Sequence, residues 1–199
     1  MSHIDYYFST ISPFTYLAGQ RMEAVAEKHG ATVTYKPLDI MGLFAQTGGV
    51  PVPQRHPSRI EMRSVEMARQ AKKNDMPINA KPMFWPTNAA PSSYAIIAAQ
   101  NAGGGDLGGL VHGFLRAVWA EERDISQDDV VQDLLTTHGF DGGLAMSGML
   151  SGADTYAANL EEAIQSGVFG APFYIVNGTE KFWGQDKIAE LDMFLNGDL

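Results

Sequence analysis

The sequence contains no cysteine. Because disulfides, thiolate metal sites, cysteine nucleophiles and dithiol exchange all need that sulfur, each of them is excluded. Any thiol chemistry must come from a thiol that the protein binds. The five histidines stand at positions 3, 29, 56, 112 and 138, and no two have the one-turn spacing that puts metal ligands on one helical face. We therefore predict no metal site.

The chain also has few basic residues and no long hydrophobic run. Lysine and arginine number 14 against 23 acidic residues, a formal charge of −9 that repels phosphate backbones, so we expect no nucleic-acid partner. Apolar stretches end well short of the ~20 residues that a spanning helix needs, so we expect no membrane span. The first residues lack the basic and apolar regions of an export signal, which favours a cytoplasmic protein.

Strand-like segments occur at both ends of the chain. They are predicted at 4–8, 31–36, 173–176 and 180–183. Between the first two, an apolar periodic run over 12–29 predicts a helix. Between the last two, Asn177-Gly178 is the strongest short signal for a β-hairpin. A helix over 186–195 is expected to close the chain.

The middle of the chain shows only helical periodicity, broken by glycine and proline. Helices are predicted over 40–47, 57–74, 91–102, 107–121, 127–138 and 152–166. Ser126 is expected to be the N-cap of the helix over 127–138. The sequence therefore predicts an α/β fold of order β-α-β, helices, then β-β-α. We expect one domain from 1–38 plus 167–199 and an inserted helical domain over 39–166.

The start of the chain carries a specific motif. Residues 5–9 read Asp-Tyr-Tyr-Phe-Ser and residues 12–17 read Ser-Pro-Phe-Thr-Tyr-Leu. This motif resembles the start of 2-hydroxychromene-2-carboxylate isomerases and of the related kappa-class glutathione transferases. The resemblance implies a thioredoxin-like fold of the DsbA type with glutathione as cofactor. It also implies that Ser12, followed by Pro13 and Phe14, contacts and activates the glutathione thiol.

On physical grounds alone, Ser12 has two roles open to it. A hydroxyl at a helix N-terminus can hydrogen-bond a thiolate. A serine directly before a proline at the first helical position is equally explained as an N-cap.

Two further blocks resemble the same family. Residues 167–173 read Gly-Val-Phe-Gly-Ala-Pro-Phe, and the resemblance implies a cis Ala171–Pro172 bond, with the Ala171 backbone pairing with glutathione. Residues 182–187 read Phe-Trp-Gly-Gln-Asp-Lys, and the resemblance implies that Gln185 and Asp186 hold the γ-glutamyl arm, Asp186 taking its ammonium. The alternatives are a rigid strand entry at Pro172 and a helix-start preference at Asp186.

A fourth block departs from the family pattern. Residues 47–51 read Thr-Gly-Gly-Val-Pro, which resembles a stretch that contacts glutathione in relatives. Gly49 replaces the family's asparagine. A backbone contact around Gly49 and Val50 is still expected, whereas a side-chain contact at position 49 is not.

The helical segment is expected to supply the substrate contacts. An aromatic carboxylate needs a cation and a flat apolar wall. Arg59 and Arg63, one helical turn apart, are candidates for the cation, and Trp85 for the wall. Asn88 resembles the asparagine of the family's F-P-x-N segment. The alternatives are solvated arginines and a tryptophan of the core.

The resemblance implies an enzyme that interconverts 2-hydroxychromene-2-carboxylate and trans-o-hydroxybenzylidenepyruvate in the bacterial degradation of naphthalene-like aromatics. It also suggests a homodimer. Two other functions remain open: a kappa-like glutathione transferase acting on other electrophiles, and a module that binds glutathione or a peptide without catalysis.

Overall fold

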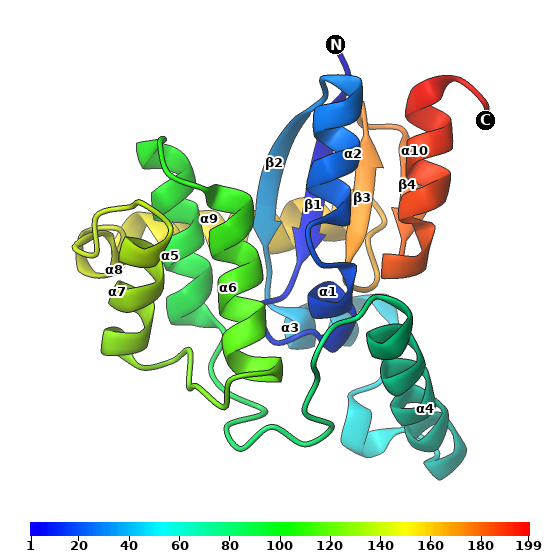
Figure 1. Cartoon of the computed structure of the whole chain (residues 1–199), viewed down its shortest axis with the longest axis horizontal. Coiled ribbons are helices and arrows are strands. Elements are labelled where there is room, and N and C mark those ends of the chain that lie inside the picture. The colour runs from blue at the N-terminus through cyan, green and yellow to red at the C-terminus, as the bar shows by residue number, and fades with distance from the viewer.

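The computed structural model describes all residues, 1–199, and is built on a four-stranded mixed sheet (Figure 1). The strand order is β2-β1-β3-β4, with β1 parallel to β2 and β3 antiparallel to β1 and β4. The strands are β1 (His3–Phe8), β2 (Thr32–Pro37), β3 (Phe173–Val176) and β4 (Glu180–Trp183). Asn177 and Gly178 join β3 to β4 with φ angles of 50° and 75°. The expected strands and hairpin are confirmed.

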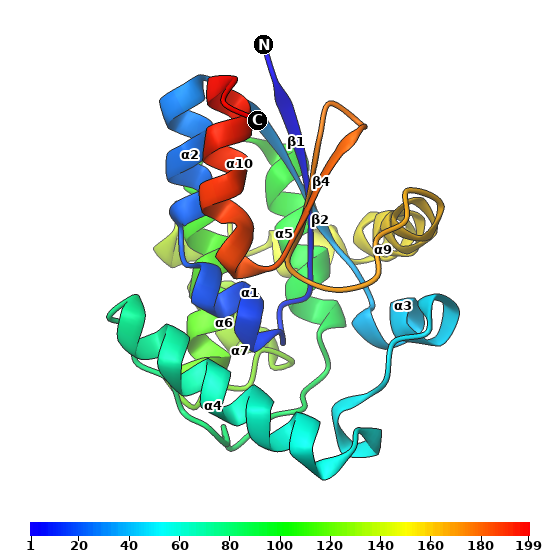
Figure 2. The ribbon, with the colours of Figure 1, turned by 90° about the vertical axis from the view of Figure 1, so that its right-hand side faces the viewer.

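Helices cover both faces of this sheet, as the edge-on view in Figure 2 shows. One face carries α2 (Arg21–His29) and α10 (Ile188–Asn196), and the other carries α3 (Ile40–Thr47) and α9 (Met149–Gln165). Successive residues of β1 therefore serve two cores, since side chains alternate along a strand. Tyr6 and Phe8 belong to the larger apolar cluster, and Tyr7 belongs to the smaller one under α3 and α9.

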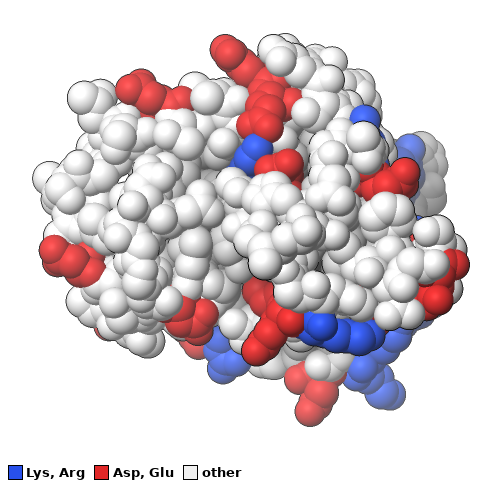
Figure 3. Space-filling view, turned by 90° about the horizontal axis from the view of Figure 1, so that it is seen from above, with Lys and Arg blue, Asp and Glu red and all other residues white.

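Five further helices lie between β2 and β3 in the sequence. They are α4 (Pro57–Lys73), α5 (Ala90–Ala102), α6 (Leu107–Trp119), α7 (Asp128–Thr137) and α8 (Leu144–Ser147). A 3-10 turn at Val52–Gln54 precedes α4, and another at Gln185–Lys187 follows β4. None of the helices has the length and apolar character needed to cross a membrane. On the face in Figure 3, acidic and basic side chains are interspersed and most of the surface is uncharged.

The helical segment packs directly against the sheet. The Gln100 side chain accepts a hydrogen bond from Tyr35 N at 2.8 Å and donates one to Tyr35 O at 3.1 Å, so α5 satisfies the backbone of this residue on the edge strand β2. The larger core cluster joins Ile4 and Tyr174 of the sheet to Phe114 and Leu134 of the helical segment. The division into two domains stays a prediction, and this shared core couples the two parts.

Two local predictions were wrong. The run over 12–29 is two helices, α1 (Pro13–Ala18) and α2. They are separated at Gly19, which adopts φ 59° and ψ −142°, a backbone conformation that residues with a Cβ atom disfavour. Ser126 does not cap α7. Its Oγ donates instead to the carboxylate of Asp124 at 2.8 Å, and the N-cap is Gln127, which makes no side-chain capping bond. The missed helix α8 has only four residues, too few for a periodic signal.

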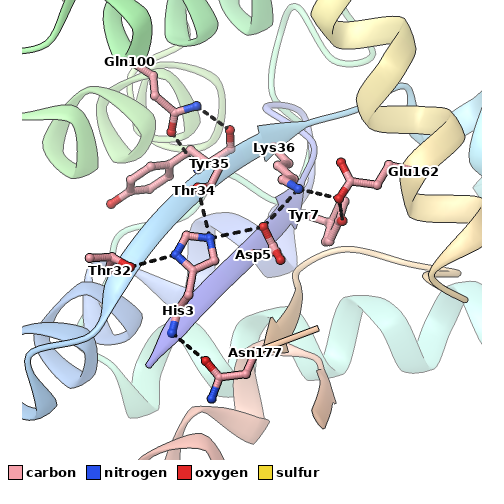
Figure 4. A network of polar contacts seen from close by, with 10 residues as sticks. All are labelled: His3, Asp5, Tyr7, Thr32, Thr34, Tyr35, Lys36, Gln100, Glu162 and Asn177. Atoms are coloured by element: carbon pink, nitrogen blue, oxygen red, sulfur yellow. Dashed lines mark hydrogen bonds and ion pairs between the residues drawn. The ribbon is translucent and has the colours of Figure 1, made fainter. Parts of the chain in front are cut away.

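A polar network ties α9 to the sheet (Figure 4). The ammonium of Lys36 lies 2.9 Å from Asp5 Oδ1 and 2.5 Å from Glu162 Oε1. The Tyr7 hydroxyl donates to the same Glu162 oxygen at 3.0 Å. Lys36 and Asp5 are mostly buried, with side chains 13% and 18% exposed, whereas Glu162 is 47% exposed.

We expect Lys36→Met to destabilise the fold by about 2 kcal/mol, because it leaves the Asp5 carboxylate mostly buried without the Lys36 ammonium. The control Glu162→Gln removes a half-exposed partner and should cost below about 1 kcal/mol. Urea unfolding of the two variants measures the difference. Equal losses would show that the burial of Asp5 does not govern the network.

A carboxyl group is enclosed between α2 and β2. The Tyr35 hydroxyl donates to Glu23 Oε1 at 3.3 Å, and Glu23 Oε2 is buried without a hydrogen-bond partner. Burial raises the pKa of Glu23 from 4.5 to about 7. The folded state therefore holds a proton that the unfolded chain releases above pH 4.5.

The stability contributed by protonated Glu23 is complete below pH 4.5 and falls as the pH rises toward about 7. We expect Glu23→Gln to remove this fall and to raise the free energy of unfolding at pH 8 by on the order of 2 kcal/mol. Urea titrations at pH 5 and pH 8 test it. Glu27→Gln, an exposed change on the same helix, is the control and should leave the pH dependence of the wild type intact.

Candidate functional site

A cavity of about 810 Å³ opens beside the start of α1. Its wall combines the entry to α1, α3 with the loop that follows it, the first turns of α4, the loop at 85–87, the segment 169–171 and Trp183. The charged residues of the wall are three arginines, Arg55, Arg59 and Arg63, with no acidic residue. In a chain of formal charge −9, this wall is suited to an anionic ligand.

Ser12 lies at the junction of β1 and α1 and lines the cavity. Its Oγ accepts a hydrogen bond from Thr15 N at 3.2 Å, which makes it the N-cap of α1. Its own backbone N–H donates to Ser9 O at 3.0 Å. Since Oγ accepts the backbone N–H, its own proton remains available to a ligand. The structural and the functional roles of Ser12 are therefore compatible.

Trp85 and Arg63 form the wall next to Ser12. The indole Nε1 of Trp85 donates to the carbonyl of Ile11, the residue before Ser12, at 3.0 Å. The Arg63 guanidinium lies 5.6 Å from the centre of the Trp85 ring and makes no ion pair. Burial, and then the nearby charge of Arg55, lowers the pKa of Arg63. A half-buried cation on an aromatic ring is an arrangement suited to a planar carboxylate.

The loop after α3 brings in a residue that the sequence analysis missed. Arg55 Nε donates to Val50 O at 2.7 Å, and its guanidinium lies 5.8 Å from the centre of the Phe44 ring. The spacing of four residues between Arg59 and Arg63 extends back to Arg55, and this regularity could have indicated it. A Cβ atom at Gly49 would collide with the ring of Phe44.

The structure brings together most of the predicted site residues. Those that line the cavity are Ser12, Pro13, Phe14, Gly49, Val50, Arg59, Arg63, Trp85 and Ala171. The Ala171–Pro172 bond is cis, as the resemblance implies. Pro172 is buried behind the wall, and its carbonyl accepts from Gly184 N at 3.0 Å.

Three further predicted residues, like Pro172, lie outside the cavity wall. The Gln185 side chain is buried, and its Oε1 accepts from Arg21 at 2.7 Å, so it holds the turn after β4 against the α1–α2 junction. Asn88 Oδ1 accepts from Ala90 N at 3.0 Å at the entry to α5. Asp186 is exposed and free of ion pairs, which leaves its carboxylate available to a ligand. Their proposed ligand contacts stay predictions.

The sheet order, the covering helices and the cis-proline segment beside a helix start define a thioredoxin-type protein. A family model for the DSBA-like thioredoxin domain matches residues 3–196. The chain belongs to that family.

Among relatives, the 2-hydroxychromene-2-carboxylate isomerase of Sphingobium xenophagum is 27% identical over 195 residues, 96% of this chain and 97% of that protein. The glutathione S-transferase kappa 1 of Caenorhabditis elegans is 31% identical over 85 residues, 42% of this chain and 37% of that protein. The resemblance to the isomerase family is thus confirmed at modest identity over nearly the whole chain.

Solved structures that share the fold include the following two. A 2-hydroxychromene-2-carboxylate isomerase superposes with a TM-score of 0.76 at 22% identity, covering 98% of this chain and 95% of that one. The cytosolic disulfide reductase DsbM of Pseudomonas aeruginosa with GSH superposes with a TM-score of 0.72 at 17% identity, covering 98% of both chains.

We expect Gly49→Ala to destabilise the protein by about 1–3 kcal/mol, because the new methyl group must displace the ring of Phe44. Gly142→Ala is the matched control, since its Cβ would lie 3.3 Å from the nearest atom, a methyl group of Thr136. Thermal unfolding of both variants measures the effect. A Gly49→Ala protein as stable as the Gly142→Ala protein contradicts the expectation.

Proposed function

We propose that this protein is a glutathione-dependent isomerase that interconverts 2-hydroxychromene-2-carboxylate and trans-o-hydroxybenzylidenepyruvate. The observation that carries the proposal is the position of the Ser12 hydroxyl, in a cavity whose charged residues are arginines without acidic partners. The near full-length similarity to proteins named for this activity supports it. We also propose a cytoplasmic location, because glutathione is kept reduced there. A homodimer stays a prediction.

The residues of the cavity fit glutathione. A wall without acidic residues suits its carboxylates, and its peptide groups would pair with the backbone at Ala171, in the manner of an added strand. The free carboxylate of Asp186 is proposed to take the α-ammonium group. Val50 and the turn around Gly49 supply backbone contacts. When bound, glutathione supplies the thiol that adds reversibly to the substrate, so that a double bond can rotate.

Ser12 is the proposed catalytic residue. Its hydroxyl accepts the Thr15 N–H, which polarises the O–H group and makes it a better donor. Donation to the sulfur favours the thiolate, the nucleophilic form. Arg63 is proposed to bind the carboxylate of the substrate, and Trp85 is proposed to stack on the aromatic ring of the substrate. Arg59 adds positive charge at the exposed mouth of the cavity.

A kappa-like glutathione transferase is the second candidate, supported by the partial match to the kappa 1 enzyme. It differs in stoichiometry, because conjugation consumes glutathione whereas isomerisation does not. Turnover of a generic aryl halide to a stable conjugate, without isomerisation of the chromene, favours the transferase. A non-catalytic module predicts glutathione binding and no turnover of either substrate.

We expect Ser12→Ala to lower kcat for the isomerisation by about 100-fold or more while glutathione still binds, because the variant loses the donor to the sulfur. Ser12→Thr keeps both the hydroxyl and the N-cap and should retain most of the activity. Steady-state kinetics and calorimetry measure the two effects. An unchanged kcat in Ser12→Ala contradicts the role of Ser12.

Asp186→Ala should weaken glutathione binding by about tenfold, the loss of one charge-assisted hydrogen bond. Asp198→Ala, an exposed acidic change near the chain end, is the control for net charge. Calorimetry gives both dissociation constants. Absence of binding to the wild type at millimolar glutathione overturns the proposed function itself.

A further inference from the structure

The cavity contains two arginine–aromatic pairs, and the proposed function uses only one of them. Arg63 lies on Trp85, which is bonded to the carbonyl next to Ser12. Arg55 lies on Phe44, which comes from α3. Figure 2 shows the chain passing from α3, through the loop that follows, into α4 below α1. The second pair therefore comes from a different segment of the chain, and it lines the same cavity.

The Arg55 guanidinium is oriented but incompletely used. Its Nε donates to Val50 O at 2.7 Å, and it makes no other hydrogen bond and no ion pair. The two terminal nitrogens are thus free to donate. Burial, followed by the charge of Arg59, lowers the pKa of Arg55. A half-buried guanidinium with free terminal donors matches the two oxygens of a carboxylate.

Phe44 explains why position 49 is a glycine. Because a Cβ there would collide with the Phe44 ring, the ring occupies the space that a side chain at position 49 would need. The same ring supports Arg55 at 5.8 Å. At position 49 the space for a side chain is therefore filled by the Phe44 ring, and this ring supports the Arg55 cation.

We propose that Arg55, supported by Phe44, binds the glycyl carboxylate of glutathione. The inference rests on the proposed function and adds a cofactor-binding residue to it. Arg55 is bonded to Val50, in the loop proposed to contact the cofactor backbone, whereas Arg63 and Trp85 lie at Ser12, where the substrate meets the sulfur. The two pairs thus serve two ligands.

Calorimetry with glutathione and its glycyl monoethyl ester tests the proposal, because the ester lacks only the carboxylate in question. The wild type should bind glutathione about tenfold more tightly than the ester, a difference of about 1.4 kcal/mol. Arg55→Met should bind both equally. Arg69→Met, an exposed change on α4 in a residue paired with Glu66 at 2.7 Å, removes the same charge outside the cavity and should keep the tenfold preference.

Equal binding of glutathione and ester by the wild type overturns the inference and leaves the proposed function standing. A preference lost in Arg59→Met but retained in Arg55→Met also overturns it. No binding of either ligand to the wild type overturns the proposed function instead. Circular dichroism checks that Arg55→Met is folded. If it is not, Phe44→Leu keeps the cation and removes its support, and it should lower the preference about threefold.

Discussion

The position of β1 at the centre of the sheet is the constraint on which the rest of the structure depends. β1 is hydrogen-bonded to β2 on one side and to β3 on the other, and helices cover both of its faces. Such a strand cannot shift its register without moving Tyr6 and Phe8 out of one core and Tyr7 out of the other. Because Ser12 follows four residues after this strand, the register of β1 also determines where the Ser12 hydroxyl lies.

The cavity reverses the charge balance of the chain. Acidic residues exceed basic ones by nine overall, yet the cavity wall contains three arginines and no carboxylate. Unpaired cations that are partly removed from water cost stability, and an anionic ligand bound in this cavity would reduce that cost. Aromatic rings hold two of these cations in place, Phe44 for Arg55 and Trp85 for Arg63.

The helical segment does more than cover the sheet. Gln100 of α5 hydrogen-bonds the backbone N–H and C=O of Tyr35 on the edge strand β2, and Glu162 of α9 pairs with Lys36 of that strand. α4 brings Arg59 and Arg63 to the cavity, while the loop before it brings Arg55. Segments distant in the sequence therefore determine both the edge of the sheet and the charge of the site.

The sequence by itself determined the order of strands and helices, because periodicity and turn residues such as Asn177-Gly178 are local signals. It also indicated Ser12 and the segment at Ala171–Pro172, because each stands in a short run of residues that resembles the isomerase family. It did not reveal the break at Gly19, since one glycine interrupts an otherwise helical pattern, nor that Asp124 competes for the Ser126 hydroxyl.

Only the tertiary structure decided which polar residues reach the cavity. Gln185 and Asn88 stand in segments that resemble the same family as the segment of Ala171 does, yet neither lines the cavity. Gln185 Oε1 accepts from Arg21, and Asn88 Oδ1 accepts from the backbone at the entry of α5. The pairing of Arg55 with Phe44 and the need for Gly49 depend on contacts between a helix and the loop that follows it. Periodicity along a chain reports which face of an element is buried, whereas a binding site depends on which elements meet there.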